Sequence, residues 1–185
     1  MEQRVKNNPT KVATKWALIN AVTGIIITYA FEFLDVDQTS GVAYLTYIPF
    51  IAFLILAQKE FKDELGGYIS FGDAFSTGFR YALFTGLLLA LFTYVYLTWL
   101  SPAMIDKMVE TTRVALEKNN TPDDQMEKQL GFTREWGAIM GAFGIAVGYA
   151  IFGAIISLVG AAILKKERSP YDIANEAVDP SDPTV

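Results

Sequence analysis

Carboxylate, amine, guanidinium, hydroxyl and amide groups are the side chains with which this chain could do chemistry, because none of its 185 residues is a histidine or a cysteine. Zinc, haem and iron–sulfur centres normally use imidazole or thiolate ligands, and Ser-His-Asp and Cys-His catalysis need the same groups. Paired carboxylates, a lysine base or an oxygen-only metal site would remain, but no metal-binding spacing or glycine-rich phosphate loop occurs. We therefore expect no catalytic residue, no metal and no cofactor.

Asp73 and Arg80 are the first candidate pair, because seven residues place them two turns apart on one helical face. Together they could bind a lipid headgroup phosphate or form a gating pair. In the alternative interpretation, Asp73 caps the start of a helix and Arg80 extends its charge to the membrane interface.

A second candidate is the polar face formed by Asn20, Gly24, Thr28 and Glu32, which recur every four residues. Asn20, Thr28 and Glu32 could line a polar path, with Glu32 binding a proton or a cation. The alternative is that Asn20 hydrogen-bonds a neighbouring helix and that Glu32 lies at a solvated edge.

The elements that must position these residues are four stretches without any charged side chain, at 16–31, 38–58, 81–105 and 136–164. A bilayer core about 30 Å thick needs about 20 mostly apolar helical residues. The sequence thus predicts an all-α integral membrane protein with four transmembrane helices, at 12–34, 39–58, 74–100 and 135–164. Pro49 is expected to kink the second helix. The tails 1–11 and 167–185 flank the domain 12–166, and the second tail is predicted to be disordered.

Two further helical segments are expected outside the bilayer. Gly66-Gly67, followed by the capping pair Ser70 and Asp73, predicts an amphipathic interfacial helix within 59–79. In the outer loop 101–134, Ser101-Pro102 opens a helical hairpin. One apolar stripe of this hairpin is the expected docking face, and it consists of Met104, Ile105, Met108 and Leu116.

Small residues at helical spacing predict where the transmembrane helices touch. The third helix carries Gly78, Ala82 and Gly86. In the last helix the expected packing face is Gly137, Gly141, Gly144 and Gly148, extended by Gly153, Ser157 and Gly160. Such rows allow close backbone contact in lipid. They could also permit helix sliding in a transporter, although static packing explains them without motion.

Basic residues are distributed unequally between the two sides of the predicted bundle. Ten of the fifteen lysines and arginines fall in the N-terminal tail, the second connection and the C-terminal side, and five fall in the long loop 101–134. The positive-inside bias therefore puts both termini in the cytoplasm. The net charge of −5 and the absence of a basic patch argue against a nucleic-acid partner.

Four elements in order carry a family resemblance: a polar first helix, GYISFGDAF at 67–75, the Ser101-Pro102 turn, and a glycine-rich last helix closing with ISLVGAAILKK at 156–166. Over residues 10–166 the chain resembles the small four-helix membrane proteins of Bacteroidota catalogued as domain of unknown function 4199. The resemblance implies a bacterial inner (cytoplasmic) membrane and suggests a membrane partner, such as a lipid-linked glycosyltransferase. The resemblance brings no established activity, and no catalytic residues can be carried over from it.

The leading functional hypothesis is a non-catalytic scaffold or accessory subunit that contacts the lipid bilayer and a membrane-protein partner or a second copy of itself. The second hypothesis is a small transporter for a lipid-linked molecule or a small solute, using the polar face of the first helix. An enzyme is the third. A polar cavity at membrane depth would favour transport, whereas a tightly packed interior would favour the subunit.

Single cysteines at Asn7, Asn119 and Ser181 test the topology in intact spheroplasts with a thiol reagent that does not cross the membrane. The basic-residue bias predicts labelling at Asn119 alone. Labelling at Asn7 or Ser181 without labelling at Asn119 would reverse the predicted orientation.

Overall fold

A computed structural model describes residues 8–34, 36 and 41–167, and within these ranges the chain is helical apart from short connections. The expected all-α architecture is confirmed. The helices are α1 (Pro9–Phe33), α2 (Tyr47–Glu64), α3 (Phe71–Val95), α4 (Ala103–Lys118) and α5 (Asp123–Leu164). A 3-10 turn, η1 (Gly41–Thr46), precedes α2, and a π-helical turn, η2 (Tyr96–Leu100), continues α3.

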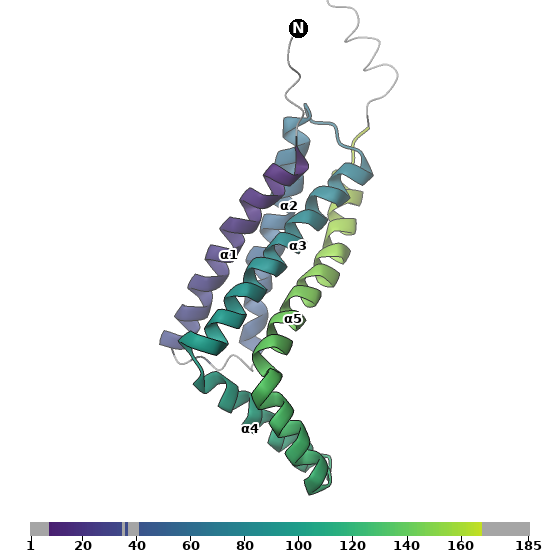
Figure 1. Cartoon of the computed structure of the whole chain (residues 1–185). Coiled ribbons are helices and arrows are strands. Elements are labelled where there is room, and N and C mark those ends of the chain that lie inside the picture. Colours follow the sequence, from purple (N-terminus) through teal and green to yellow (C-terminus); the bar gives the residue numbers. More distant parts are fainter. Residues whose placement is uncertain (1–7, 35, 37–40, 168–185) are drawn as a thin grey trace, which may run out of the picture.

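Helices α1, α2, α3 and the C-terminal part of α5 form one bundle, in which α3 makes its most extensive contacts with α5 and α1 (Figure 1). The start of α1 and the end of α5 lie at the same end, beside the α2–α3 connection. There the Arg80 guanidinium donates to the Thr10 hydroxyl at 2.9 Å, and the backbones of Ile69 and Lys166 exchange two hydrogen bonds of 2.9 and 3.0 Å. We call this end of the bundle, with the start of α1 and the end of α5, the terminal end, and we call the opposite end of the bundle the hairpin end.

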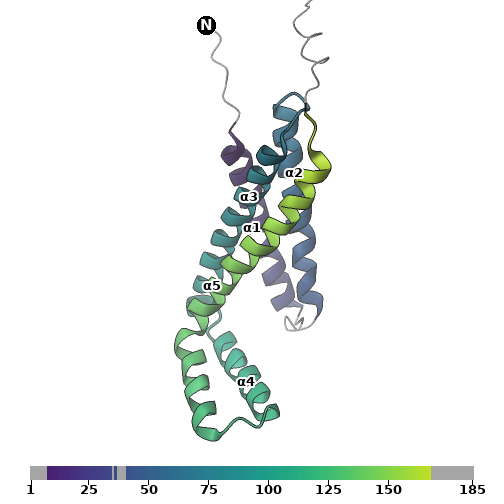
Figure 2. The same cartoon turned by 90° about the vertical axis from the view of Figure 1, so that its right-hand side faces the viewer.

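Three helices are long and apolar enough to cross a membrane: Pro9–Phe33, Phe71–Leu100 and Asp123–Leu164. The chain is thus a helical membrane protein. At 1.5 Å per residue the 42 residues of α5 extend about 63 Å, about twice the thickness of a bilayer core. The first part of α5 therefore projects from the bundle, and α4 folds back against it to form a hairpin (Figure 2).

Local sequence explains where the helices of the bundle begin. Pro9 opens α1, and the Asn8 side chain accepts a hydrogen bond from the Thr10 amide at 2.9 Å. The Ser70 hydroxyl accepts from the Asp73 amide at 3.1 Å at the start of α3, as the capping pair predicts. Between α2 and α3, Gly66 and Gly67 adopt φ values of +78° and +86°, which take the chain out of the helical path that ends at Glu64.

Three expectations about the helices need correction. No separate interfacial helix occurs in 59–79, because α2 runs on to Glu64 and α3 already begins at Phe71. Pro49 does not kink α2 in mid-membrane, since it lies in the first turn, where a helix needs no amide donor. The last helix does not start at 135, because the second arm of the hairpin and the final span are one helix, α5.

Close contact between α3 and α5 is built on small residues. A Cβ added to Gly153 would overlap Ala82 Cβ, and one added to Gly86 would lie 3.1 Å from Tyr149 Cβ. A Cβ on Gly78 would lie 2.6 Å from the Ser157 hydroxyl. The row of small residues predicted on the third helix therefore does pack in the bundle.

The packing face predicted for the last helix is partly wrong. Gly137 is buried and Gly141 is half-buried, but Gly144 and Gly148 are exposed, with no atom of the chain within 4 Å of an added Cβ. The reason is rotational: the five residues from Gly148 to Gly153 turn a helix by about 140°. Gly153, Ser157 and Gly160 therefore form a different face rather than an extension of the first one.

Matched glycine-to-alanine changes test this assignment. Gly153→Ala should lower the free energy of unfolding by about 1–3 kcal/mol, because the methyl group would force α3 and α5 apart. Gly148→Ala should leave it unchanged or raise it, since alanine favours a helix by up to about 1 kcal/mol. Unfolding in a mild detergent measures both, and equal losses would contradict the assignment.

Candidate functional site

The side-chain amide of Gln58, near the terminal end of α2, is one of several fully buried polar groups in the bundle. It has no exposed surface, and its Nε2 donates to the backbone oxygens of Ala74 in α3 and Ser157 in α5, both at 3.0 Å. Both acceptors are helical carbonyls that use a second lone pair. One amide therefore joins three helices.

Two glycines make room for this amide. A Cβ on Gly160 would overlap Gln58 Oε1, and one on Gly78 would lie 2.7 Å from Gln58 Nε2. Gln58 Oε1 and the Ser157 hydroxyl are buried without a hydrogen-bond partner in the described part of the chain. Sequence reasoning missed Gln58, because an amide at the end of an uncharged stretch resembles an interfacial residue. The facing pair Gly78 and Gly160 was the available signal, but it becomes informative only once the helix pairing is known.

A second polar cluster joins α1 and α2 at the terminal end. Glu60 forms an ion pair with Lys15 and accepts a hydrogen bond of 2.8 Å from the Trp16 indole. The Trp16 ring in turn lies 5.5 Å from that of Phe53. A tryptophan with one apolar face and one hydrogen-bonded edge suits a membrane interface. This cluster is structural, since each of its polar groups has its partner within the chain.

Asp73 and Arg80 do not meet as a pair. Asp73 accepts a hydrogen bond of 2.7 Å from the Ser70 hydroxyl at the start of α3, and Arg80 donates to Thr10 of α1. The two side chains therefore serve different contacts, and the capping interpretation of Asp73 is the one that the geometry supports.

The residues of the predicted polar face of α1 differ in how far they are exposed to solvent or lipid. Asn20 is 3% exposed, whereas Glu32 is exposed at the hairpin end. The Thr28 hydroxyl donates to the backbone oxygen of Gly24 at 2.9 Å, so its proton is already used. The three residues do not line one continuous channel in the described structure.

The stripe predicted as a docking face packs inside the hairpin instead. Met104, Ile105, Met108 and Leu116 are each half-buried. A Cβ on Gly137 of α5 would lie 3.5 Å from Ile105 Cδ1 and 3.8 Å from Met108 Cε. The apolar side of an amphipathic helix here finds its partner within the chain, so this stripe is not a free surface.

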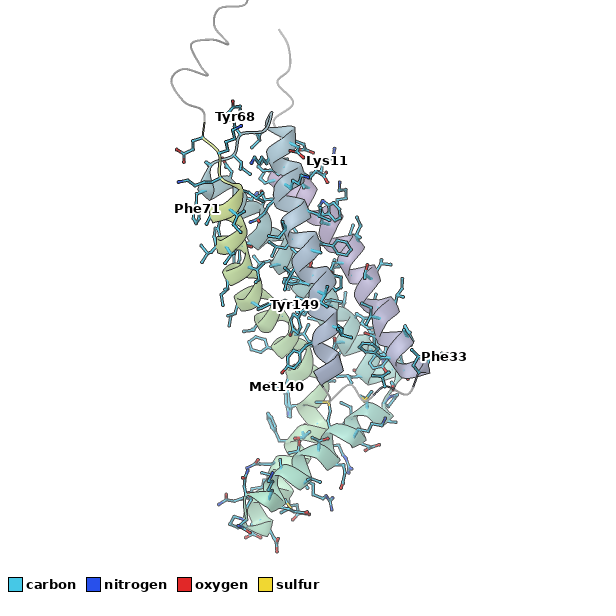
Figure 3. The ribbon with its side chains drawn as sticks, turned by 180° about the vertical axis from the view of Figure 1, so that it is seen from behind. Lys11, Phe33, Tyr68, Phe71, Met140 and Tyr149 are labelled. Atoms are coloured by element: carbon cyan, nitrogen blue, oxygen red, sulfur yellow. The ribbon has the colours of Figure 1, made fainter. Side chains whose placement is uncertain are left out.

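A cavity of about 290 Å³ lies toward the hairpin end, and we call it the hairpin-end cavity. Its wall includes Thr28 of α1, Leu89 and Tyr96 from α3 and η2, Met104 of α4 and Tyr149 of α5. Tyr149 stands about midway along the bundle, well short of Lys11 and Tyr68 at the terminal end (Figure 3). This cavity could not be predicted from the sequence, because π-helical turns have no simple sequence pattern.

Groups of acidic residues that could hold a metal ion are not found in residues 8–34, 36 and 41–167. The side chains described above hold helices together, and the hairpin-end cavity is mostly apolar. The geometry defines the class as a helical membrane bundle with a projecting hairpin.

Comparison with known sequences then supplies the family. Residues 15–166 match the family described as "Protein of unknown function (DUF4199)", and the chain belongs to this family. The membership of this family that was inferred from the order of its elements is confirmed. No curated protein and no solved structure matches the chain.

Proposed function

We propose that this protein is a non-catalytic subunit of a membrane complex, in which a packed helical bundle holds a hairpin outside the bilayer for contact with a partner. The observation that supports this most directly is the projection of α4 and the first part of α5 beyond the bundle (Figure 2). The bilayer surrounds the bundle, and the partner is another membrane protein or a second copy of the chain. We assign it to the bacterial inner membrane, as the family resemblance implies.

Helix α2 would be the fourth membrane span. Its own 18 residues end in a charged segment, but together with η1 it contains most of the uncharged stretch 38–58. That stretch has 21 residues, about the length that a bilayer core needs. With four spans, both termini would share the cytoplasmic side and the hairpin would lie outside.

The hairpin is suited to contact because it keeps its shape without a partner. Its two arms pack through the half-buried stripe, and Arg134 of α5 lies 3.6 Å from Asp106 of α4. Apolar side chains nevertheless remain on the outward face of α5, where Phe132 is 54% exposed and Trp136 is 44% exposed. Large apolar groups next to a membrane interface favour contact with another membrane protein.

Transport has less support. Between the hairpin-end cavity and the terminal end, the bundle is filled by Phe50, Leu54 and Tyr81, which have no exposed surface. The Tyr81 hydroxyl also donates to the backbone oxygen of Phe50 at 3.0 Å, which joins α3 to α2 across this region. A path through the protein would require these contacts to break.

Phe132→Glu tests the subunit role. If the outward face of α5 contacts a partner, this change should reduce co-purified partner or homo-oligomer by more than about tenfold, since burying a phenylalanine contributes about 1.5–3 kcal/mol. Cross-linking in native membranes, followed by mass spectrometry, measures this.

Thr111→Glu is the matched control, because it adds the same charge at an exposed position of α4. Both variants should insert and melt like the native chain. Unchanged partners in Phe132→Glu would contradict the proposed role of this face.

A further inference from the structure

The hairpin-end cavity has the wall of a site for a hydrocarbon chain. Leu89, Phe92 and Leu97 supply apolar surface, and Ile145 closes the side toward α5. An apolar cavity of about 150 Å³ in a protein interior already binds benzene. A volume of about 290 Å³ therefore admits a longer apolar segment, and water gains few hydrogen bonds in such surroundings.

One polar group in this wall lacks a partner. Tyr96 is 5% exposed, and its hydroxyl makes no hydrogen bond of ordinary geometry within the described residues. The Ser101 and Glu32 side chains lie close enough to interact with this hydroxyl by hydrogen bonding, although neither forms a bond of ordinary geometry, so a ligand oxygen would compete with them. A buried hydroxyl without a partner is costly, so a ligand oxygen placed here would be bound with a gain in free energy.

The π-helical turn η2 explains why Tyr96 faces inward. The turn is wider than an α-helical one and is closed by a 2.7 Å hydrogen bond from the Ser101 amide to the backbone oxygen of Tyr96. Both Tyr96 and Leu97 thereby lie in the cavity wall. Trp99 remains 72% exposed on the other side. Turns of this kind often occur at functional sites.

The cavity runs along the bundle axis from Leu89 to Tyr96, which is about 10 Å for seven helical residues. Trp99 lies one turn further on, and tryptophans favour the headgroup level of a bilayer. The polar end of the cavity thus lies near the membrane interface and its apolar end lies deeper. A lipid acyl chain has the same arrangement, with its polar ester group near the interface and its hydrocarbon chain deeper in the bilayer.

We infer that the hairpin-end cavity binds one acyl chain of a lipid from the leaflet on the hairpin side, with the ester carbonyl accepting a hydrogen bond from the Tyr96 hydroxyl. The exposed carboxylate of Glu32 near this end favours a headgroup with an amine over an anionic one. Met104 at the start of α4 covers the same space, so the bound chain would contact the base of the hairpin. The inference does not depend on any protein partner.

Photo-crosslinking tests the site. The purified protein is placed in phosphatidylglycerol vesicles that contain phosphatidylethanolamine with a diazirine in one acyl chain, and labelled peptides are mapped by mass spectrometry. Labelling is expected on the segments of α1 and α3 around Thr28, Leu89 and Thr93. Thr93→Phe should reduce it by about tenfold, because the ring would occupy the space of the chain.

Leu91→Phe is the matched control, since Leu91 is two residues away on the same helix and is 63% exposed. It should leave the labelling unchanged. Tyr96→Phe removes one oxygen without changing the shape of the ring, and it should weaken retention of the lipid about fivefold in native mass spectrometry, the effect of one hydrogen bond. This variant keeps the test valid if Thr93→Phe does not fold.

Two results would overturn the inference. One is equal labelling of the cavity wall in the native chain and in Thr93→Phe. The other is labelling confined to the exposed faces of α1 and α5. Phosphatidylglycerol carrying the same diazirine chain tests the headgroup, and labelling equal to that by phosphatidylethanolamine would overturn the preference for an amine.

Discussion

The side-chain amide of Gln58 is buried where water cannot reach it, so its donors must find acceptors inside the bundle. A buried amide without partners costs several kcal/mol in an apolar medium, and here the Gln58 Nε2 group donates to two helix carbonyls. They belong to Ala74 and Ser157, which lie on two different helices. The two bonds from the Nε2 of one side chain of α2 therefore hold α3 and α5 at a set separation at the terminal end. A side chain larger than glycine at position 78 or 160 would displace the amide.

This constraint divides the molecule into two parts with different properties. Between the Gln58 amide and the cavity, the middle of the bundle is closed by Phe50, Leu54 and Tyr81, which have no exposed surface. Toward the hairpin end the packing leaves a cavity, because η2 departs from α-helical geometry and α4 turns away from the bundle. The closed part supports a scaffold role, and the open part supports the binding of a lipid chain beside the base of the hairpin.

Much of this architecture could be predicted from the sequence, since uncharged length and small-residue spacing are local properties. The apolar membrane helices and the contact surface of α3 follow from them, and the hairpin follows from the Ser101-Pro102 helix start and the apolar stripe behind it. The surroundings of the candidate sites could not be predicted, because they depend on helix rotation. Met108 could equally well have faced a partner, and its contact with Gly137 depends on how α4 folds against α5. Gly148 has the same spacing signal as Gly141, yet α5 turns it away from the bundle.

The free energy of unfolding of Gln58→Leu is the most direct measurement of the central claim. Leucine is somewhat larger and branched but has no polar atom, so the change removes the two hydrogen bonds, which should together contribute about 1–2 kcal/mol in a membrane protein. Lys59→Leu adds the same side chain at the next, exposed position and should have little effect. A Gln58→Leu protein as stable as the native one would show that the amide does not hold the three helices together.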